Sequence, residues 1–212
     1  MLHPFCPLCS STAHHLYTHG QREFLQCSSC SSVFLHPKNY LTPEQEKAHY
    51  ENHNNDPDDL GYQKFVSPIT NSILTNHNST ESGLDFGSGT GSPILKVLSD
   101  NRYSIVQYDL YFHNDKKKLE QQYDYIAASE VAEHFKDPLA EFTLLRSLLK
   151  PKGKLYIMTG VFDGSTAFSA WPYKNDHTHV FLYHPKAFEW IKNHFGYKKV
   201  TITNKKLIVL EL

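Results

Sequence analysis

Residues 84–98 read LDFGSGTGSPILKVL, an apolar run that breaks into three glycines at alternate positions and then resumes with helical character. Glycine adopts positive φ values without strain and lets a ligand approach the backbone where any Cβ would collide. The helix N-terminus that follows would add unpaired N–H donors and a partial positive charge. The stretch therefore predicts a buried strand, a glycine loop of the nucleotide-binding type and a helix, the arrangement found at the carboxyl end of a parallel strand.

The three glycines, Gly87, Gly89 and Gly91, do not follow the best-known glycine patterns. A dinucleotide-binding loop has its third glycine where Ser92 stands here, and no Gly-Lys-Ser/Thr follows as a P-loop requires. Further on, the run SIVQYD ends in Asp109. An acid at such a strand end accepts hydrogen bonds from ribose hydroxyls. The pattern indicates a nucleotide-type site that is neither a dinucleotide fingerprint nor a P-loop.

Two more strand-like runs follow, YDYIAASE and LLKPKGKLYIMT, and the chain ends in YKKVTIT and KLIVLEL. With the glycine loop and Asp109, this succession resembles class I S-adenosylmethionine-dependent methyltransferases over residues 83–212. The resemblance implies an α/β fold with a Rossmann-like sheet of seven strands, or a shortened form of it, and a terminal antiparallel hairpin. Shortening is expected because only fifteen residues separate Asp109 from Asp124, too few for the usual helix and strand.

The resemblance also implies roles for single residues. The glycines would lie against the methionine and ribose parts of S-adenosylmethionine, Asp109 would hold the ribose, and Ser129 and Glu130 would face the methionyl end. Asp85 would orient the loop or meet the cofactor's amino group, while Leu110, or the two aromatic residues after it, would cover the adenine. The cofactor-binding residues implied in this way are Asp85, Gly87, Gly89, Gly91, Asp109, Leu110, Ser129 and Glu130.

A second group of polar residues stands in the sequence EVAEH. Glu130, Glu133 and His134 occupy positions i, i+3 and i+4, which predicts three side chains on one face of a helix. Downstream, DHTHVFLYH supplies His179. Glu-x-x-Glu-His with a later histidine is similar to the metal-assisted O-methyltransferases that act on small-RNA 3′ ends, and ubiquinone-pathway O-methyltransferases carry a related form.

That similarity implies a divalent cation, Mg²⁺ or Mn²⁺, held by Glu130, Glu133, His134 and His179, because mixed oxygen and imidazole ligands suit such ions. The ion would lower the pKa of an acceptor hydroxyl and orient it toward the sulfonium methyl. In the metal-free alternative the glutamate meets the cofactor, and His134 or His179 is the catalytic base. EVAEH is the reason for expecting oxygen as the methyl acceptor.

All four cysteines lie in the first thirty residues, as the CxxC pairs Cys6/Cys9 and Cys27/Cys30. This spacing is that of a zinc ribbon, in which two pairs complete a tetrahedron around one structural ion. A segment of ~35 residues is too small to bury an adequate core, so a metal staple is physically needed. Two disulfides, which a reducing cytosol disfavours, and a catalytic redox pair are the alternatives.

The predicted organisation is a zinc ribbon over residues 1–36, a helical linker or cover over 37–82 and the methyltransferase domain over 83–212. In the middle segment, Thr42 followed by a proline has the form of a helix start. This segment is either a plain covering layer or a lid that closes over a ligand. The residues available for such a lid are Tyr50, His53, Asn54 and Tyr62.

The 212 residues carry a formal net charge of −1, which offers no global attraction to nucleic acid or to an anionic membrane. The apolar stretches are too short to span a bilayer, and the first residues lack a secretory signal. We therefore expect a cytoplasmic methyltransferase with a small-molecule acceptor. One alternative is an RNA methyltransferase whose ribbon grips RNA, which is disfavoured because Arg22 is the ribbon's single Lys or Arg residue. The other is a non-catalytic module that binds the cofactor, or a protein partner through the ribbon.

Overall fold

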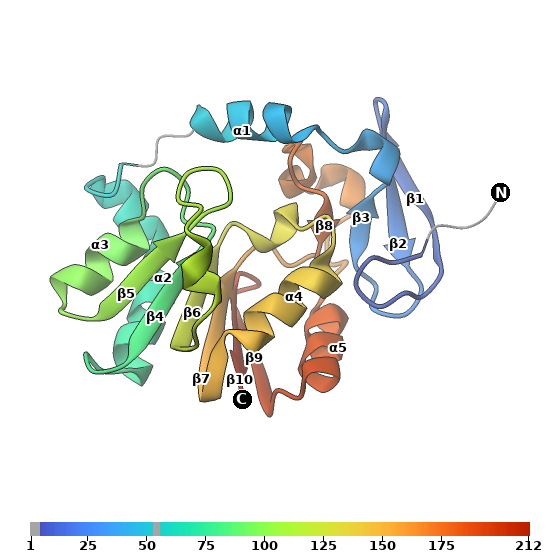
Figure 1. The fold of residues 1–212 in the computed structure, drawn as a ribbon. Helices are drawn as coiled ribbons and strands as arrows, with labels where there is room; N and C mark the ends of the chain where they lie inside the picture. Colours follow the sequence, from blue (N-terminus) through green and yellow to red (C-terminus); the bar gives the residue numbers. More distant parts are fainter. Residues whose placement is uncertain (1–4, 53–55) are drawn as a thin grey trace.

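The computed structural model describes residues 5–52 and 56–212 (Figure 1). Its larger sheet has the strand order β5-β4-β6-β7-β10-β9, in which β4 to β7 run parallel and β10 is antiparallel to both neighbours. The predicted α/β class and terminal hairpin are confirmed. The strands are β4 (Ser82–Phe86), β5 (Ser104–Tyr108), β6 (Tyr123–Ser129), β7 (Leu149–Met158), β9 (Lys199–Thr203) and β10 (Leu207–Glu211).

This sheet has six strands in the described part of the chain, and β5 and β9 are its edges. Between β5 and β6 the chain makes a bridge from Asp109 to His113 and a short 3-10 helix, Lys116–Leu119. So few residues leave no length for a further crossover helix and strand. Among the described residues this sheet therefore has no further strand beyond β5.

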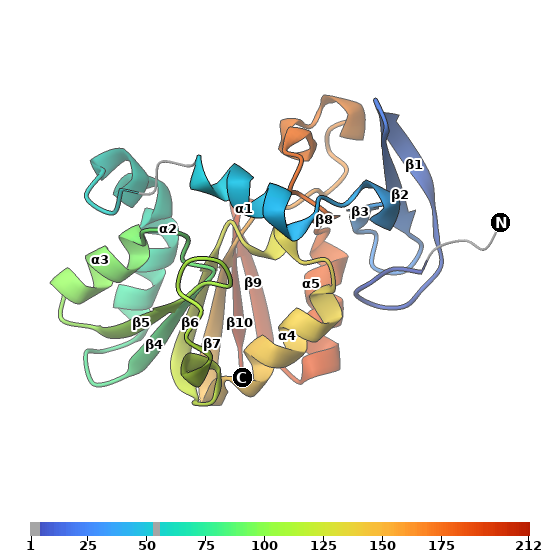
Figure 2. The same cartoon turned by 45° about the horizontal axis from the view of Figure 1, so that its top comes forward.

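Helices cover both faces of the sheet (Figures 1 and 2). Successive residues of a strand point to opposite faces, so Tyr125 of β6 packs with α2 and α3, whereas Ile126 packs with α4 and α5. No helix among the described residues is long and apolar enough to cross a bilayer. The helices are α1 (Pro43–Glu51), α2 (Leu60–Asn76), α3 (Pro93–Asp100), α4 (Pro138–Ser147) and α5 (Pro185–Phe195).

Helix α1 crosses above the carboxyl ends of the parallel strands (Figure 2). It begins where the sequence predicts: the side chain of Thr42 accepts a hydrogen bond from Gln45 N at 3.3 Å, and Gln45 Oε1 accepts one from Thr42 N at 3.0 Å. This reciprocal capping box satisfies two N–H groups at the helix start. Two of the lid candidates, His53 and Asn54, lie outside the described residues.

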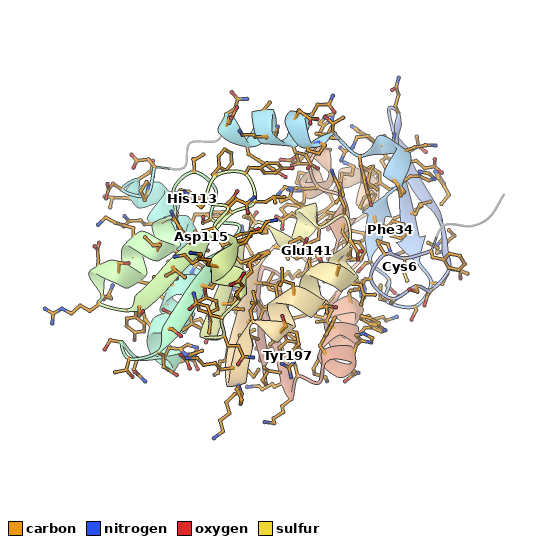
Figure 3. The ribbon with its side chains drawn as sticks, in the orientation of Figure 1. Cys6, Phe34, His113, Asp115, Glu141 and Tyr197 are labelled. Carbon is orange, nitrogen blue, oxygen red and sulfur yellow. The ribbon has the colours of Figure 1, made fainter. Side chains whose placement is uncertain are left out.

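A second sheet, of order β1-β2-β3-β8, joins the N-terminal segment to the larger part. Its strands are β1 (Ala13–His19), β2 (Arg22–Cys27), β3 (Val33–Leu35) and β8 (Phe181–Leu182). Strand β8 comes from the C-terminal half of the chain and pairs antiparallel with β3. Cys6 and Phe34 lie where this sheet meets the larger part, in one apolar core with Phe181 and Tyr183 (Figure 3).

Candidate active site

The glycine loop follows β4 in the conformation that glycine makes accessible. Gly87 and Gly89 have φ values of 77° and 65°. A Cβ on Gly87 would lie 2.5 Å from a methyl carbon of Val131, so any side chain here would force Val131 to move. The N–H groups of Gly87 and Ser88 donate to the carbonyl of Tyr108 at 2.8 and 3.2 Å. The loop is therefore tied to the end of β5.

Asp109 connects the glycine loop to the next turn of the chain. Its Oδ2 accepts a hydrogen bond from Gly89 N at 2.9 Å, and its Oδ1 accepts from Tyr111 N at 2.8 Å and from Phe112 N at 3.1 Å. A carboxylate is an acceptor that binds several N–H groups at once. One buried side chain thus organises both walls of the space above β4 and β5.

Asp85 lies beneath the loop and contacts it through Ser92. The Ser92 hydroxyl donates to Asp85 Oδ2 and accepts from Leu95 N at 2.8 Å, so Ser92 also caps α3. Burial raises the pKa of Asp85 to about 7, against the opposing effect of the hydrogen bond from Ser92. Of its two expected roles, this geometry supports orientation of the loop.

A single open cavity of about 1240 Å³ extends from the glycine loop to the histidines under α1. This volume accommodates a cofactor and a small acceptor together. Neither Asp85 nor Gly91 is among its described lining residues, whereas the lid candidates Tyr50 and Tyr62 are. The expected cofactor residues that line it are Gly87, Gly89, Asp109, Leu110, Ser129 and Glu130.

The EVAEH segment is not the α-helical turn that its spacing predicts. Glu130 has a φ of 52°, in the left-handed region, and a short 3-10 helix, Ala132–His134, follows it. The N–H of Glu130 donates to Met158 O at 2.7 Å, which prolongs the pairing of β6 with β7 by one hydrogen bond. The expectation of one shared helical face was therefore wrong, because the sheet continues into the motif.

Three of the four expected cation ligands nevertheless converge. One ligand atom from each of Glu133, His134 and His179 lies within 4.8 Å of the others, and Glu130 is outside this group. His134 Nδ1 and His179 Nδ1 hydrogen-bond to the carbonyls of Thr178 and Tyr173 at 3.0 and 2.7 Å. A carbonyl only accepts, so each Nδ1 carries a proton, and Nε2 is the ring atom left to bind a further ligand.

Burial shapes the charge of this cluster. Glu133 is fully buried, which raises the pKa of its carboxyl group, and burial lowers the pKa of His179. The hydroxyl of Tyr173 donates to Glu133 and, at 3.3 Å, to Glu130 Oε2. The neutral imidazole of His179 therefore lies next to the carboxyl group of Glu133, which has no full positive charge beside it.

Asp176 also lines the cavity, close to His179, and was not predicted from the sequence. Its Oδ2 lies 4.0 Å from His179 Nε2 and 3.5 Å from His49 Nε2, while Glu133 Oε1 lies 3.9 Å from the same atom of His179. The signal was present in DHTHV, where an acid stands three residues before His179. Nothing in the sequence indicated the contact between Asp176 and His49, because these two residues are far apart in the chain.

The four cysteines form a compact sulfur cluster with all ligand atoms within 4.8 Å of one another. The Sγ atoms of Cys6 and Cys30 lie 3.8 Å apart and those of Cys9 and Cys27 lie 3.4 Å apart. These distances match the ~3.8 Å edge of a tetrahedron with Zn–S bonds of ~2.3 Å. None of the four cysteines is joined in a disulfide, unlike the disulfide alternative.

Comparison with known proteins identifies the larger part of the chain. The methyltransferase domain family matches residues 60–202, from α2 into β9. The chain belongs to this family. No curated protein matches it. Together with the structural neighbours described next, the family match makes the chain an S-adenosylmethionine-dependent methyltransferase.

Solved structures of methyltransferases share the fold of this methyltransferase at low sequence identity. One, a SAM-dependent methyltransferase from Archaeoglobus fulgidus, has a TM-score of 0.56 and 15% identity, over 71% of this chain and 94% of that chain. Another, the Burkholderia thailandensis 1,6-didemethyltoxoflavin-N1-methyltransferase with bound 1,6-didemethyltoxoflavin and S-adenosylhomocysteine, has a TM-score of 0.55 and 13% identity, over 94% and 98%. An O-methyltransferase family protein from the same organism has a TM-score of 0.53 and 12% identity, over 78% and 62%.

Proposed function

We propose that this methyltransferase transfers the methyl group of S-adenosylmethionine to a hydroxyl group of a small molecule, assisted by a divalent cation at Glu133, His134 and His179. The observation that carries the proposal is the cavity itself. The glycine loop lies at one end, and His134 and His179 lie at the other. Donor and acceptor would therefore meet in one cavity, and such positioning supplies most of the rate in a direct displacement.

The cofactor would occupy the end of the cavity near β4 and β5. Asp109 accepts three backbone N–H groups, and a carboxylate offers about four acceptor positions, so it keeps capacity for a ribose hydroxyl. Leu110 would cover the adenine. Ser129 and Glu130 line the cavity at the end of β6, next to the space for the methionyl group.

The donor set at the other end fits a divalent cation. One carboxylate and two imidazoles suit Mn²⁺, and Mg²⁺ less well. Metal-binding histidines usually donate their second N–H to a carbonyl, as His134 and His179 do here. Glu133 Oε2 is buried with no hydrogen-bond partner among the described residues. A bound cation would lower the pKa of an acceptor hydroxyl.

The residues of the chain supply positioning and a base. The acceptor oxygen forms a bond to the methyl carbon while the carbon–sulfur bond breaks, and its electron pair returns to sulfur, leaving neutral S-adenosylhomocysteine. With the cation bound, the Nε2 atoms of His134 and His179 would be its ligands, and the hydroxyl proton would pass to water. In the metal-free alternative, His179 Nε2 would accept the proton, and the lowered pKa of His179 keeps its imidazole neutral for that role at neutral pH.

The charges around the cavity favour a small molecule over RNA. Six carboxylate residues line it: Glu46, Asp109, Glu130, Asp137, Glu141 and Asp176. The single Lys or Arg among the described lining residues is Lys136, whose ammonium group lies 2.8 Å from Glu46 Oε1. A polyanion would meet repulsion without an unpaired cation to bind its phosphates. The acceptor is therefore neutral or cationic.

We also propose that the cysteine cluster binds one structural Zn²⁺. The N–H groups of Ser29 and Cys30 each donate to Cys27 Sγ at 3.4 Å, which favours a thiolate at that position. Four protein ligands leave no open coordination position for chemistry. The ion would therefore stabilise the N-terminal sheet and take no part in methyl transfer.

Calorimetric titration with S-adenosylhomocysteine and electron paramagnetic resonance titration with Mn²⁺ test the two ends of the cavity separately. We expect His179→Ala and Glu133→Ala to lose Mn²⁺ affinity by more than about tenfold, the loss of roughly one charge-assisted interaction. The matched control is His14→Ala, at an exposed position of β1. Unchanged Mn²⁺ affinity in both variants would overturn the cation site, and absent binding heat with S-adenosylhomocysteine would overturn the cofactor site.

A further inference from the structure

The segment Lys174–Val180, which carries Asp176 and His179, is held by the N-terminal sheet at both of its ends. We infer that Arg22, on β2, is a positioning residue for the acceptor end of the active site. This inference rests on the proposed role of His179 and deepens it, because it gives the N-terminal sheet a task in methyl transfer.

The first anchor is the guanidinium group of Arg22. Its Nη1 donates to the carbonyls of Lys174 and Asn175 at 2.9 and 3.4 Å, and its Nη2 donates to the carbonyl of Asp176 at 2.7 Å. The guanidinium is planar and its donors have fixed directions. Three successive carbonyls turned toward one such group define the path of the backbone directly before the site.

The second anchor is the pairing of β3 with the C-terminal half. Leu35 N donates to the carbonyl of Val180 at 2.8 Å, and Val180 N donates to the carbonyl of Glu133 at 2.8 Å. The residue next to His179 is thus held between the N-terminal sheet and the backbone of a proposed cation ligand. Leu35 of β3 therefore supports the backbone next to His179 from the side of the N-terminal sheet.

Between the anchors, the segment is fixed by its own hydrogen bonds. Asp176 Oδ1 accepts from Thr178 N at 2.8 Å and from its hydroxyl at 2.5 Å. His179 Nδ1 donates to the carbonyl of Tyr173. These bonds all lie within residues 173–179, so they fix the shape of the segment. Its place against Glu133 and His134 depends on the bond from Val180 N to Glu133 O, on the bond from His134 Nδ1 to Thr178 O, and on the contacts from β2 and β3.

The location of Arg22 also indicates the role of its positive charge. It is the single Lys or Arg of residues 1–36, and only 8% of its surface is exposed. Burial of a cation is costly unless polar partners compensate for the lost water. Here the partners are the carbonyls of residues 174–176 beside the active site. Because the guanidinium group is buried, a nucleic acid outside the protein could not contact it.

Hydrogen–deuterium exchange of Arg22→Gln tests the inference without any knowledge of the acceptor. We expect amide exchange over residues 174–180 to rise at least tenfold and Mn²⁺ affinity to fall at least tenfold. Exchange over 87–95 should not change, and affinity for S-adenosylhomocysteine should stay within twofold. The matched control is Lys38→Gln, which removes an exposed partner of Glu23 in the same sheet and should change neither region.

The outcomes distinguish this inference from the proposed function. A folded Arg22→Gln protein with wild-type exchange over 174–180 would overturn the role of Arg22. A wild-type protein that binds no Mn²⁺ would overturn the cation, while the exchange result would still decide on Arg22. Should Arg22→Gln fail to fold, Arg22→Lys keeps the charge and loses the planar fork. We expect a smaller rise of exchange in the same residues, and no rise there would count against the inference.

Discussion

Gly89 N donates a hydrogen bond of 2.9 Å to Asp109 Oδ2, so the glycine loop and the acid at the end of the neighbouring strand form one unit. Because Asp109 also accepts from Tyr111 N and Phe112 N, it fixes the two backbone segments between which a nucleoside would lie. The carboxylate is therefore expected to act twice, by shaping the empty site and by binding the ribose.

Replacement of Asp109 by Asn tests this double role. The amide keeps one acceptor oxygen but loses the charge and offers N–H donors toward backbone N–H groups. We expect affinity for S-adenosylhomocysteine to fall about ten- to hundredfold, the worth of one or two hydrogen bonds to a charged group. Calorimetric titration measures it. Asp115→Asn, at an exposed residue of the same segment, is the control (Figure 3), and an equal loss there would contradict the assignment.

Gly87 combines a positive φ with a close contact, and these two effects can be separated. Gly87→Ala should lose cofactor binding and about 2 kcal/mol or more of stability, because the new methyl group meets Val131 as well as straining the backbone. Gly164 is a matched control, since its φ of 78° is nearly the same and nothing lies within 4 Å of its Cβ position. Gly164→Ala should cost about 1 kcal/mol. Equal costs in urea unfolding would show that the contact with Val131 is unimportant.

Asp85 makes stability depend on pH. Its pKa is raised to about 7 in the folded protein, against about 3.9 in an unfolded chain. The folded state therefore binds more protons between these values, and stability must fall as pH rises from about 4 to 7. Asp85→Asn should remove up to about 1.4 kcal/mol per pH unit of this slope. Urea unfolding at pH 5, 6 and 7 checks it, and an unchanged slope in the variant would refute the burial argument.

The parts of the site that the sequence predicts are those built from neighbours in the chain. The loop after β4, the acid after β5 and the capping box of α1 depend on residues a few positions apart, so spacing alone indicates them. Local spacing did not predict the left-handed backbone conformation of Glu130. Its conformation is set by pairing with Met158 on another strand, which no local pattern reveals.

The acceptor end depends on contacts between distant residues. Arg22 and Lys174 are 152 positions apart, and β3 pairs with β8, which lies in the C-terminal part of the methyltransferase domain. A predicted zinc ribbon followed by a methyltransferase domain suggests two units that fold independently. The structure instead places the cysteines in one core with side chains of β8 and α5, because the N-terminal sheet lacks enough apolar surface for a core of its own.

That shared core leads to a prediction about zinc. Cys6, Cys27 and Cys30 are buried in the same apolar cluster as Phe142 and Tyr183. Removal of the ion leaves buried thiolates without their counter-charge, and binding of a structural zinc is coupled directly to folding. We therefore expect one zinc per chain by elemental analysis. A zinc-selective chelator, with Mn²⁺ resupplied, should lower the unfolding temperature of the entire protein in a single calorimetric transition.

A Cys27→Ser variant provides the control, since the chelator should cause no further loss once the tetrahedral set is broken. The same chelation should raise hydrogen exchange over residues 174–180, because strands β2 and β3 carry both anchors of that segment. Two separate transitions, with the methyltransferase part unaffected by the chelator, would show instead that the two sheets are energetically independent and that the pairing of β3 with β8 contributes little.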